Sequence, residues 1–207
     1  MADRPTTAVD ALQHLVDGNR RFVRGESRFT APAREKIADL VHAQRPFATI
    51  LGCSDSRVAP ELIFDAGLGD LFVVRVAGNV FSAEVMGSFQ FAAEQLKTPL
   101  FVVLGHEGCG AVTAALDAIH RGQRHGSRIQ HLLDGIIPGL RDIEPSLEPG
   151  EELSRGVEAN VRWSMRQLMA TPEAQARAIE GELELVGAIY EIDSGRVRFL
   201  PPTATSG

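Results

Sequence analysis

Leu100-Phe-Val-Val-Leu-Gly-His106 decides the fold, together with the similar stretch Phe47-Ala-Thr-Ile-Leu-Gly-Cys53. Both are continuous apolar runs rather than alternations, which is the pattern of parallel strands covered by helices on both faces. Further strands are expected at 70–76 and 183–190, and a last, antiparallel one at 196–200. Helical segments separate the first four runs. The order predicts an α/β fold, with a doubly wound, mostly parallel sheet of about four strands, an antiparallel edge strand and helices on both faces.

Helix-capping residues mark several of the expected helices. Thr7 is a candidate cap for residues 8–24, whose apolar side chains fall on one helical face, and Ser82 can cap a helix that follows it. Thr171-Pro172 has the pattern of a cap followed by a first-turn proline. The other expected helices cover 34–43, about 110–120, and the two segments that the loop at 144–150 separates.

Composition limits the kind of protein and its partners. The 207 residues are 44% hydrophobic and contain no repeat and no long linker, so we expect a single domain over 1–207 with a loose tail at 201–207. The net charge of −6 argues against a nucleic-acid partner. No apolar run approaches the ~20 residues of a membrane span. The first residues lack the apolar core of a signal peptide, so we expect a cytoplasmic protein.

Cys53, His106 and Cys109 form a candidate set of metal ligands that uses both cysteines of the chain. Cys53 and His106 end neighbouring apolar strands, and open α/β sheets bind ligands at this carboxyl edge. Three protein ligands with an open position are typical of catalytic zinc, whereas structural zinc sites close with four. The simpler interpretation is a pair of buried thiols, and a disulfide is disfavoured in a reducing compartment. The density of polar residues around these positions favours the metal.

Two motifs carry a resemblance to a known family. Cys53-Ser-Asp-Ser-Arg-Val58, followed by His106-x-x-Cys109-Gly110, resembles the β-class carbonic anhydrases, and the flanking pattern is similar to bacterial members, including mycobacterial ones. The resemblance implies reversible hydration of carbon dioxide to bicarbonate and a proton by a zinc-bound hydroxide, with one Zn²⁺ per subunit. It also implies a homodimer or homotetramer in which the N-terminal arm, residues 1–33, packs on a partner subunit.

Asp55 and Arg57 are the candidate catalytic residues. Their spacing lets the Asp55 carboxylate face either a metal on Cys53 or the Arg57 guanidinium, which can hold it bidentately. The alternative is an ion pair that only stabilises the loop. The resemblance implies two states of Asp55. Paired with Arg57, it leaves the metal open to water, and swung away, it becomes a fourth ligand that closes the site.

The resemblance also implies a substrate pocket. Gln44 matches a glutamine that hydrogen-bonds substrate, often across a dimer interface. Phe72 and Ala77 match the apolar wall for carbon dioxide, and the backbone N–H of Gly110 matches a donor to bicarbonate. Each residue taken alone is more often a surface amide or plain core. Phe91 stands where plant members commonly have a tyrosine.

A regulatory pocket of one subgroup of the family is incomplete in this sequence. That subgroup holds an inhibitory bicarbonate between a tryptophan, an arginine and a tyrosine. Arg75 and Tyr190 match the last two, but Ile50 occupies the tryptophan position and cannot donate a hydrogen bond. We therefore expect no strong bicarbonate inhibition through this pocket.

Three other functions compete with this interpretation. A related hydrolase of carbonyl sulfide or carbon disulfide would use the same ligands. A zinc alcohol dehydrogenase would need a G-x-G-x-x-G turn after a strand, and Gly105–Gly110 has the wrong order. A zinc-storage or redox-sensing module would leave the Asp55–Arg57 pair and Gln44 without a role.

Overall fold

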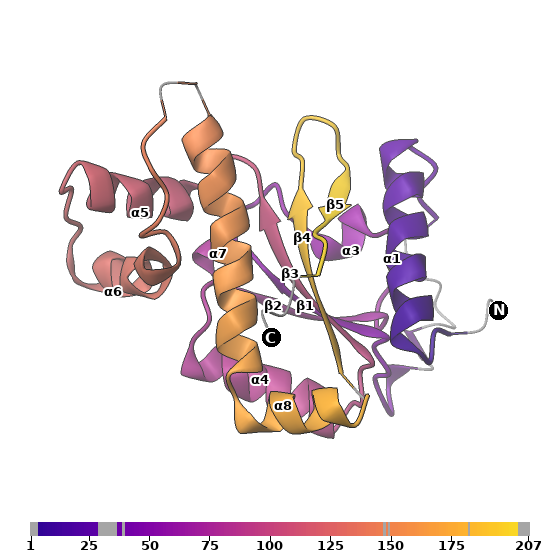
Figure 1. Cartoon of the computed structure of the whole chain (residues 1–207). Coiled ribbons are helices and arrows are strands. Elements are labelled where there is room, and N and C mark those ends of the chain that lie inside the picture. The colour runs from indigo at the N-terminus through magenta and orange to yellow at the C-terminus, as the bar shows by residue number, and fades with distance from the viewer. Residues whose placement is uncertain are drawn as a thin grey trace.

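The structure is a computed structural model that describes residues 4–28, 37, 38, 40–146, 148, 150–181 and 183–202. Within these residues, one sheet has the strand order β2-β1-β3-β4-β5 (Figure 1). The first four strands run parallel and β5 is antiparallel to β4, which confirms the predicted sheet. The strands are β1 Ala48–Gly52, β2 Leu71–Arg75, β3 Leu100–His106, β4 Glu184–Tyr190 and β5 Val197–Phe199.

Helices connect these strands, and the three predicted caps are confirmed. The hydroxyls of Thr7, Ser82 and Thr171 accept hydrogen bonds from the backbone N–H three residues further on, at 3.1, 3.4 and 3.3 Å. The helix expected over 34–43 falls partly on residues 34–36 and 39, which lie outside the described residues. The described helices are α1 Ala8–Val23, α3 Pro60–Ile63, α4 Ala83–Glu94, α5 Gly110–His120, α6 Ser127–Ile136, α7 Glu151–Met169 and α8 Pro172–Ile179, with 3-10 turns η1 Ala77–Asn79 and η2 Ile137–Gly139.

The central strands β1 and β3 are buried on both faces, as their continuous apolar runs predict, whereas the edge strands β2 and β5 are half-buried. Alternate residues of β3 point into two separate cores: Phe101 and Val103 pack with residues of α4, α5 and α7, while Val102 packs with α1 and α3. Figure 1 shows α7 and α1 on opposite sides of the sheet. Among the described residues, no helix is both long and apolar enough to cross a membrane.

Helix α1 packs on the sheet of its own chain. Ala11 and Leu15 are fully buried against β1 and β3, whereas Val9 is 71% exposed on the opposite side of the helix. Packing of the 1–33 arm on a partner subunit stays a prediction, and it would use this outer side. Residues 1–3 and 29–33 of that arm, and 203–207 of the expected tail, lie outside the described residues.

Helix α7 lies unusually close to the sheet beside the end of β3. A Cβ at Gly105 would lie 2.6 Å from Cγ2 of Val161, so only glycine allows this approach. Gly105 is the residue before His106, and β1 ends at Gly52, just before Cys53. Because β1 and β3 are parallel neighbours, their carboxyl ends meet at one edge of the sheet. Close packing of α7 therefore fixes the backbone at the point where the candidate ligands begin.

Candidate metal centre

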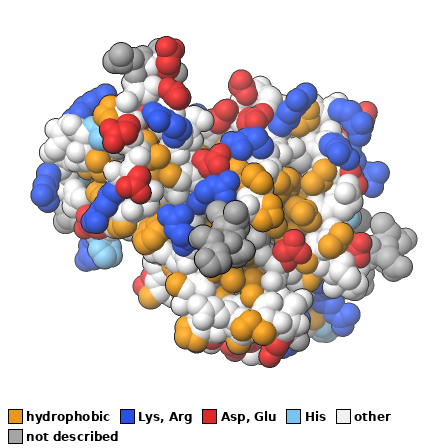
Figure 2. All heavy atoms as spheres, in the orientation of Figure 1, with side chains coloured by type: hydrophobic (Ala, Val, Ile, Leu, Met, Phe, Trp, Pro, Cys, Tyr) orange, Lys and Arg blue, Asp and Glu red, His pale blue; other side chains and the backbone are white. Residues whose placement is uncertain are grey.

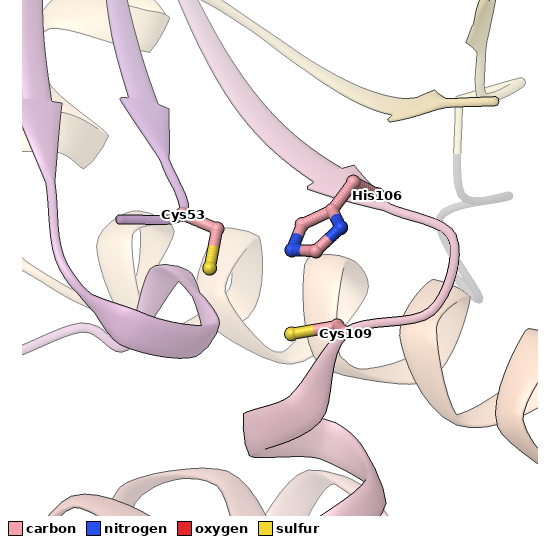
Figure 3. A group of neighbouring side chains, drawn as sticks. All are labelled: Cys53, His106 and Cys109. Atoms are coloured by element: carbon pink, nitrogen blue, oxygen red, sulfur yellow. The ribbon is translucent and has the colours of Figure 1, made fainter. Parts of the chain in front are cut away.

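The three predicted ligands come together. Cys53 follows β1, His106 ends β3, and Cys109 is the N-cap residue of α5. Their ligand atoms all lie within 4.8 Å of one another, and all three residues are buried. Figure 3 shows the two sulfur atoms and the imidazole ring pointing toward a common centre. Two strand ends and one helix start thus bring two sulfurs and one nitrogen close enough to bind a single ion.

The His106 ring presents one free nitrogen to the cysteines. Nδ1 lies 2.8 Å from the carbonyl oxygen of Glu107, which can only accept, so Nδ1 carries the proton. Nε2 is then an acceptor, and it is buried with no hydrogen-bond partner among the described residues. An unsatisfied buried acceptor is costly, and a metal ion would satisfy it. A carbonyl that fixes the ring through its other nitrogen is typical of metal-ligating histidines.

Backbone N–H groups stabilise negative charge on the sulfurs. Cys53 Sγ accepts from the N–H groups of Asp55 at 3.4 Å and Gly78 at 3.3 Å. A hydrogen bond from the adjacent Cys109 S–H, together with these two backbone N–H groups, lowers the pKa of the Cys53 thiol to about 4. The Cys53 thiolate and burial in turn raise the pKa of Cys109 far above its ordinary value. Both sulfurs can ionise together only beside a cation, so this S₂N donor set fits a soft-ligand metal ion such as zinc.

Asp55 is held beside the ligands by Arg57. Its Oδ1 accepts from the backbone N–H and Nε of Arg57 at 3.0 and 2.9 Å, and its Oδ2 accepts from Nη2 at 2.7 Å. Arg57 also donates to the carbonyl of Gly108 at 3.3 Å. The guanidinium holds the pKa of the Asp55 carboxyl well below its usual range. Oδ2 lies 4.0 Å from Nε2 of His106, so the ionised carboxylate adjoins the metal centre.

Arg75 has a role at the site that the sequence did not reveal. It ends β2 and donates from Nε to the carbonyl of Cys53 at 2.9 Å and from Nη2 to the carbonyl of Asp55 at 2.7 Å. Arg75 therefore fixes the loop that carries the first ligand. The only signal in the sequence was that Arg75 follows the apolar run 71–74 near the end of an expected strand; its pairing with Gly52 is visible only in the structure.

The predicted substrate residues divide into two groups. Ala77 precedes the Gly78 N–H that donates to Cys53, and Gly110 follows Cys109 and is exposed, so both adjoin the ligands. Gln44 is exposed on the segment that leads into β1, and Phe72 pairs with Thr49 near the start of β1. Thr49, the partner of Phe72, lies four residues before Cys53, which at about 3.3 Å per residue is about 13 Å along β1. Within one chain, Gln44 and Phe72 are not brought to the ligands.

Comparison with known proteins identifies the family. The family described as carbonic anhydrase matches residues 48–197. Carbonic anhydrase 2 of Mycobacterium tuberculosis is 42% identical over 195 residues, covering 92% of each chain. The carbonic anhydrase of Mycolicibacterium smegmatis is 40% identical over 190 residues, covering 91% of each.

Solved structures agree with this assignment. The β-carbonic anhydrase CcaA has a TM-score of 0.75 at 27% identity and covers 95% of this chain and 94% of its own. One of two tetrameric β-carbonic anhydrases from Sordaria macrospora has a TM-score of 0.75 and covers 93% of this chain and 98% of its own, although at 23% identity it supports the fold alone. The chain therefore belongs to the carbonic anhydrase family, in its β class, and is an enzyme of that family that resembles the mycobacterial members.

Proposed function

We propose that the chain binds one Zn²⁺ through Cys53, His106 and Cys109 and catalyses the reversible hydration of carbon dioxide to bicarbonate and a proton. The observation that carries the proposal is the buried S₂N cluster, in which Nε2 of His106 lacks any other partner among the described residues. Zinc bound there would supply Lewis acidity, which lowers the pKa of a coordinated water toward neutrality. Three protein ligands leave a fourth position for that chemistry.

Asp55 would orient the reacting water. As an ionised carboxylate it can only accept hydrogen bonds, so it fixes the direction of a water O–H and leaves an oxygen lone pair for carbon dioxide. Arg57 keeps Asp55 ionised, and while it binds both carboxylate oxygens it would keep them off the metal, which is the open one of the two expected states. If the pair with Arg57 broke, the carboxylate would be free to become a fourth ligand.

The substrate pocket would be completed by a partner subunit. Carbon dioxide is neutral and apolar, so Ala77 and Phe72 suit its binding, and the Gly110 N–H and the Gln44 amide suit a bicarbonate oxygen. Since Gln44 and Phe72 lie toward the other end of β1 from Cys53, a second copy of the chain would have to supply them.

Exposed apolar side chains support such an oligomer. Val41, Leu68 and Phe91 are 71%, 54% and 47% exposed, and Phe91 stacks on Phe72 of edge strand β2 at 6.2 Å between ring centroids. Hydrophobic side chains also gather over the β4–β5 region, where charged ones of both signs surround them (Figure 2). A contiguous exposed apolar patch is typical of a subunit contact. These exposed side chains support the proposed homodimer or homotetramer.

The proposal includes a cytoplasmic location and no nucleic-acid partner. Two free cysteines that must stay reduced to bind metal suit a reducing compartment. The net charge of −6 disfavours association with nucleic acid. The comparisons give no support to the carbonyl sulfide or carbon disulfide alternative.

Ligand replacement tests the proposal. Cys53→Ser, His106→Ala and Cys109→Ser should each lose most zinc and nearly all carbon dioxide hydration in stopped-flow assays, because each removes one of three ligands. His131→Ala, on α6 and exposed, is the matched control and should keep both. Zinc-loaded wild type without hydration activity would overturn the function, and full zinc with intact activity in a ligand variant would remove that residue from the set.

A further inference from the structure

The turn η1, which follows β2, adopts a strained backbone next to the metal centre. Gly78 and Asn79 have φ values of +66° and +43°, and left-handed φ is unfavourable for a non-glycine residue such as Asn79. This conformation aims the N–H of Gly78 at Cys53 Sγ, 3.3 Å away. Such a turn persists only where surrounding groups hold it.

Two polar side chains of α7 hold the turn. Nδ2 of Asn160 donates to the carbonyl of Gly78 at 2.8 Å, and Oγ of Ser164 donates to the carbonyl of Asn79 at 3.1 Å. Asn160 and Ser164 are each only 1% exposed, one helical turn apart. Burying a polar side chain costs free energy unless the side chain is hydrogen-bonded. The hydrogen bonds to the two carbonyls therefore explain why Asn160 and Ser164 can lie on the buried face of α7.

The helix that supplies these donors is itself firmly placed. Val157 and Val161 of α7 are buried in the core against β3, and the glycine at 105 lets the helix approach closely. Groups positioned by a packed helix are held more accurately than groups on loops. A chain of contacts therefore runs from the core through Asn160 and Gly78 to the Cys53 sulfur.

We propose that Asn160, supported by Ser164, is a positioning residue for the metal centre: by holding the carbonyl of Gly78 it fixes the backbone torsions of that glycine, which aim the glycine's own N–H at the Cys53 thiolate, and it thereby tunes the bond between that sulfur and the metal. The inference rests on the proposed metal site. It does not depend on which reaction the metal serves, because the contacts end on the sulfur and not on a substrate.

The test replaces zinc by cobalt, whose bond to thiolate has a visible charge-transfer band. Asn160→Ala should move this band to lower energy, since a sulfur that loses a hydrogen bond holds its lone pairs less tightly. Zinc affinity, measured by chelator competition, should fall about 10-fold, the lower end of the range for groups that orient metal ligands. Ser164→Ala should shift both quantities in the same direction by less.

Asn19→Ala is the matched control. Asn19 is also a buried asparagine, and its Nδ2 donates to the carbonyls of Ile63 and Gly195, in the part of the core built on α1 and α3. This variant should lose stability and leave the cobalt band and zinc affinity unchanged.

The outcomes separate the positioning role from the reaction. An unshifted band and unchanged zinc affinity in Asn160→Ala would overturn the inference, and if that variant does not fold, the same result in Ser164→Ala would overturn it. Wild type that binds cobalt but does not hydrate carbon dioxide would refute the proposed reaction alone. Wild type that binds neither zinc nor cobalt would overturn both.

Discussion

Replacing Asp55 by asparagine should abolish most turnover while leaving the metal in place. The two carboxylate oxygens accept three N–H groups of Arg57, at 2.7 to 3.0 Å. An amide has a single acceptor oxygen, and its NH₂ would face the guanidinium, so the substitution breaks the pair as well as removing the charge. Asp55 is not one of the three proposed ligands, and zinc content should therefore stay at the wild-type level.

The size of the effect follows from the role of the carboxylate. A positioned acid–base or orienting group is worth ~10²-fold or more in rate, which corresponds to about 2.7 kcal/mol of activation free energy.

The direction in which pH should change the activity through Asp55 is also fixed. Arg57 lowers the pKa of Asp55 in the folded protein, so its charge is fully present above the ordinary carboxyl value of about 3.9 and is lost only at lower pH. Protonation of Asp55 should cause no activity loss between about pH 5 and pH 8.

The prediction is tested by measuring the rate of carbon dioxide hydration by stopped flow with a pH indicator, on protein of measured zinc content. Asp117→Asn is the matched control, because Asp117 pairs with Arg121 at 2.6 Å on α5, away from the cluster, and should not change turnover. Arg57→Ala should also turn over slowly with its zinc retained, since Asp55 loses its partner. A zinc-replete Asp55→Asn enzyme that works at the wild-type rate would refute the role of the carboxylate.

Three further outcomes are expected. Gly78→Ala should lower the free energy of unfolding in urea by at least about 1–2 kcal/mol, because its φ is left-handed, and an unchanged unfolding midpoint would contradict the strain. Metal-free protein should show one thiolate per chain at neutral pH by ultraviolet absorbance, with a midpoint near pH 4 that Cys53→Ser removes; two ordinary thiol titrations would contradict the lowered pKa of Cys53. Added bicarbonate should inhibit only modestly, because Arg75 is already bonded to two backbone carbonyls. Steep, cooperative inhibition abolished by Tyr190→Phe would show that the regulatory pocket works.

Local signals in the sequence were sufficient for the sheet and for the cluster of Cys53, His106 and Cys109. A run such as 100–106 is apolar throughout because β3 is buried on both faces, and that property is visible without any tertiary information. The polar residue that ends such a run lies at the carboxyl edge by the geometry of parallel strands alone. Cys53 and His106 could therefore be paired from the sequence, and Cys109 followed from its spacing.

The supports of the ligands could not be predicted, because they come from distant parts of the chain. Asn160 and Gly78 are separated by 82 positions, and Asn19 and Gly195 by 176. In the sequence, Asn160 is one polar residue within an amphipathic helix, and nothing local shows that it faces inward. Backbone φ angles could not be predicted either, because nothing in the sequence around Asn79 indicates that this residue adopts a left-handed conformation.

Under the proposed function, the positions of the site residues along β1 imply that one chain alone does not make a complete substrate pocket. The metal ligands follow the carboxyl end of this strand, whereas Gln44 precedes its amino end and Phe72 lies level with Thr49. In a two-fold symmetric dimer the same surface of each subunit meets the other, so residues at one end of a strand can serve the partner's ligands reciprocally. Under the proposed function, each chain would then contribute to two pockets. Substitutions at Gln44 should consequently impair hydration without altering zinc content, which separates the pocket residues from the metal ligands.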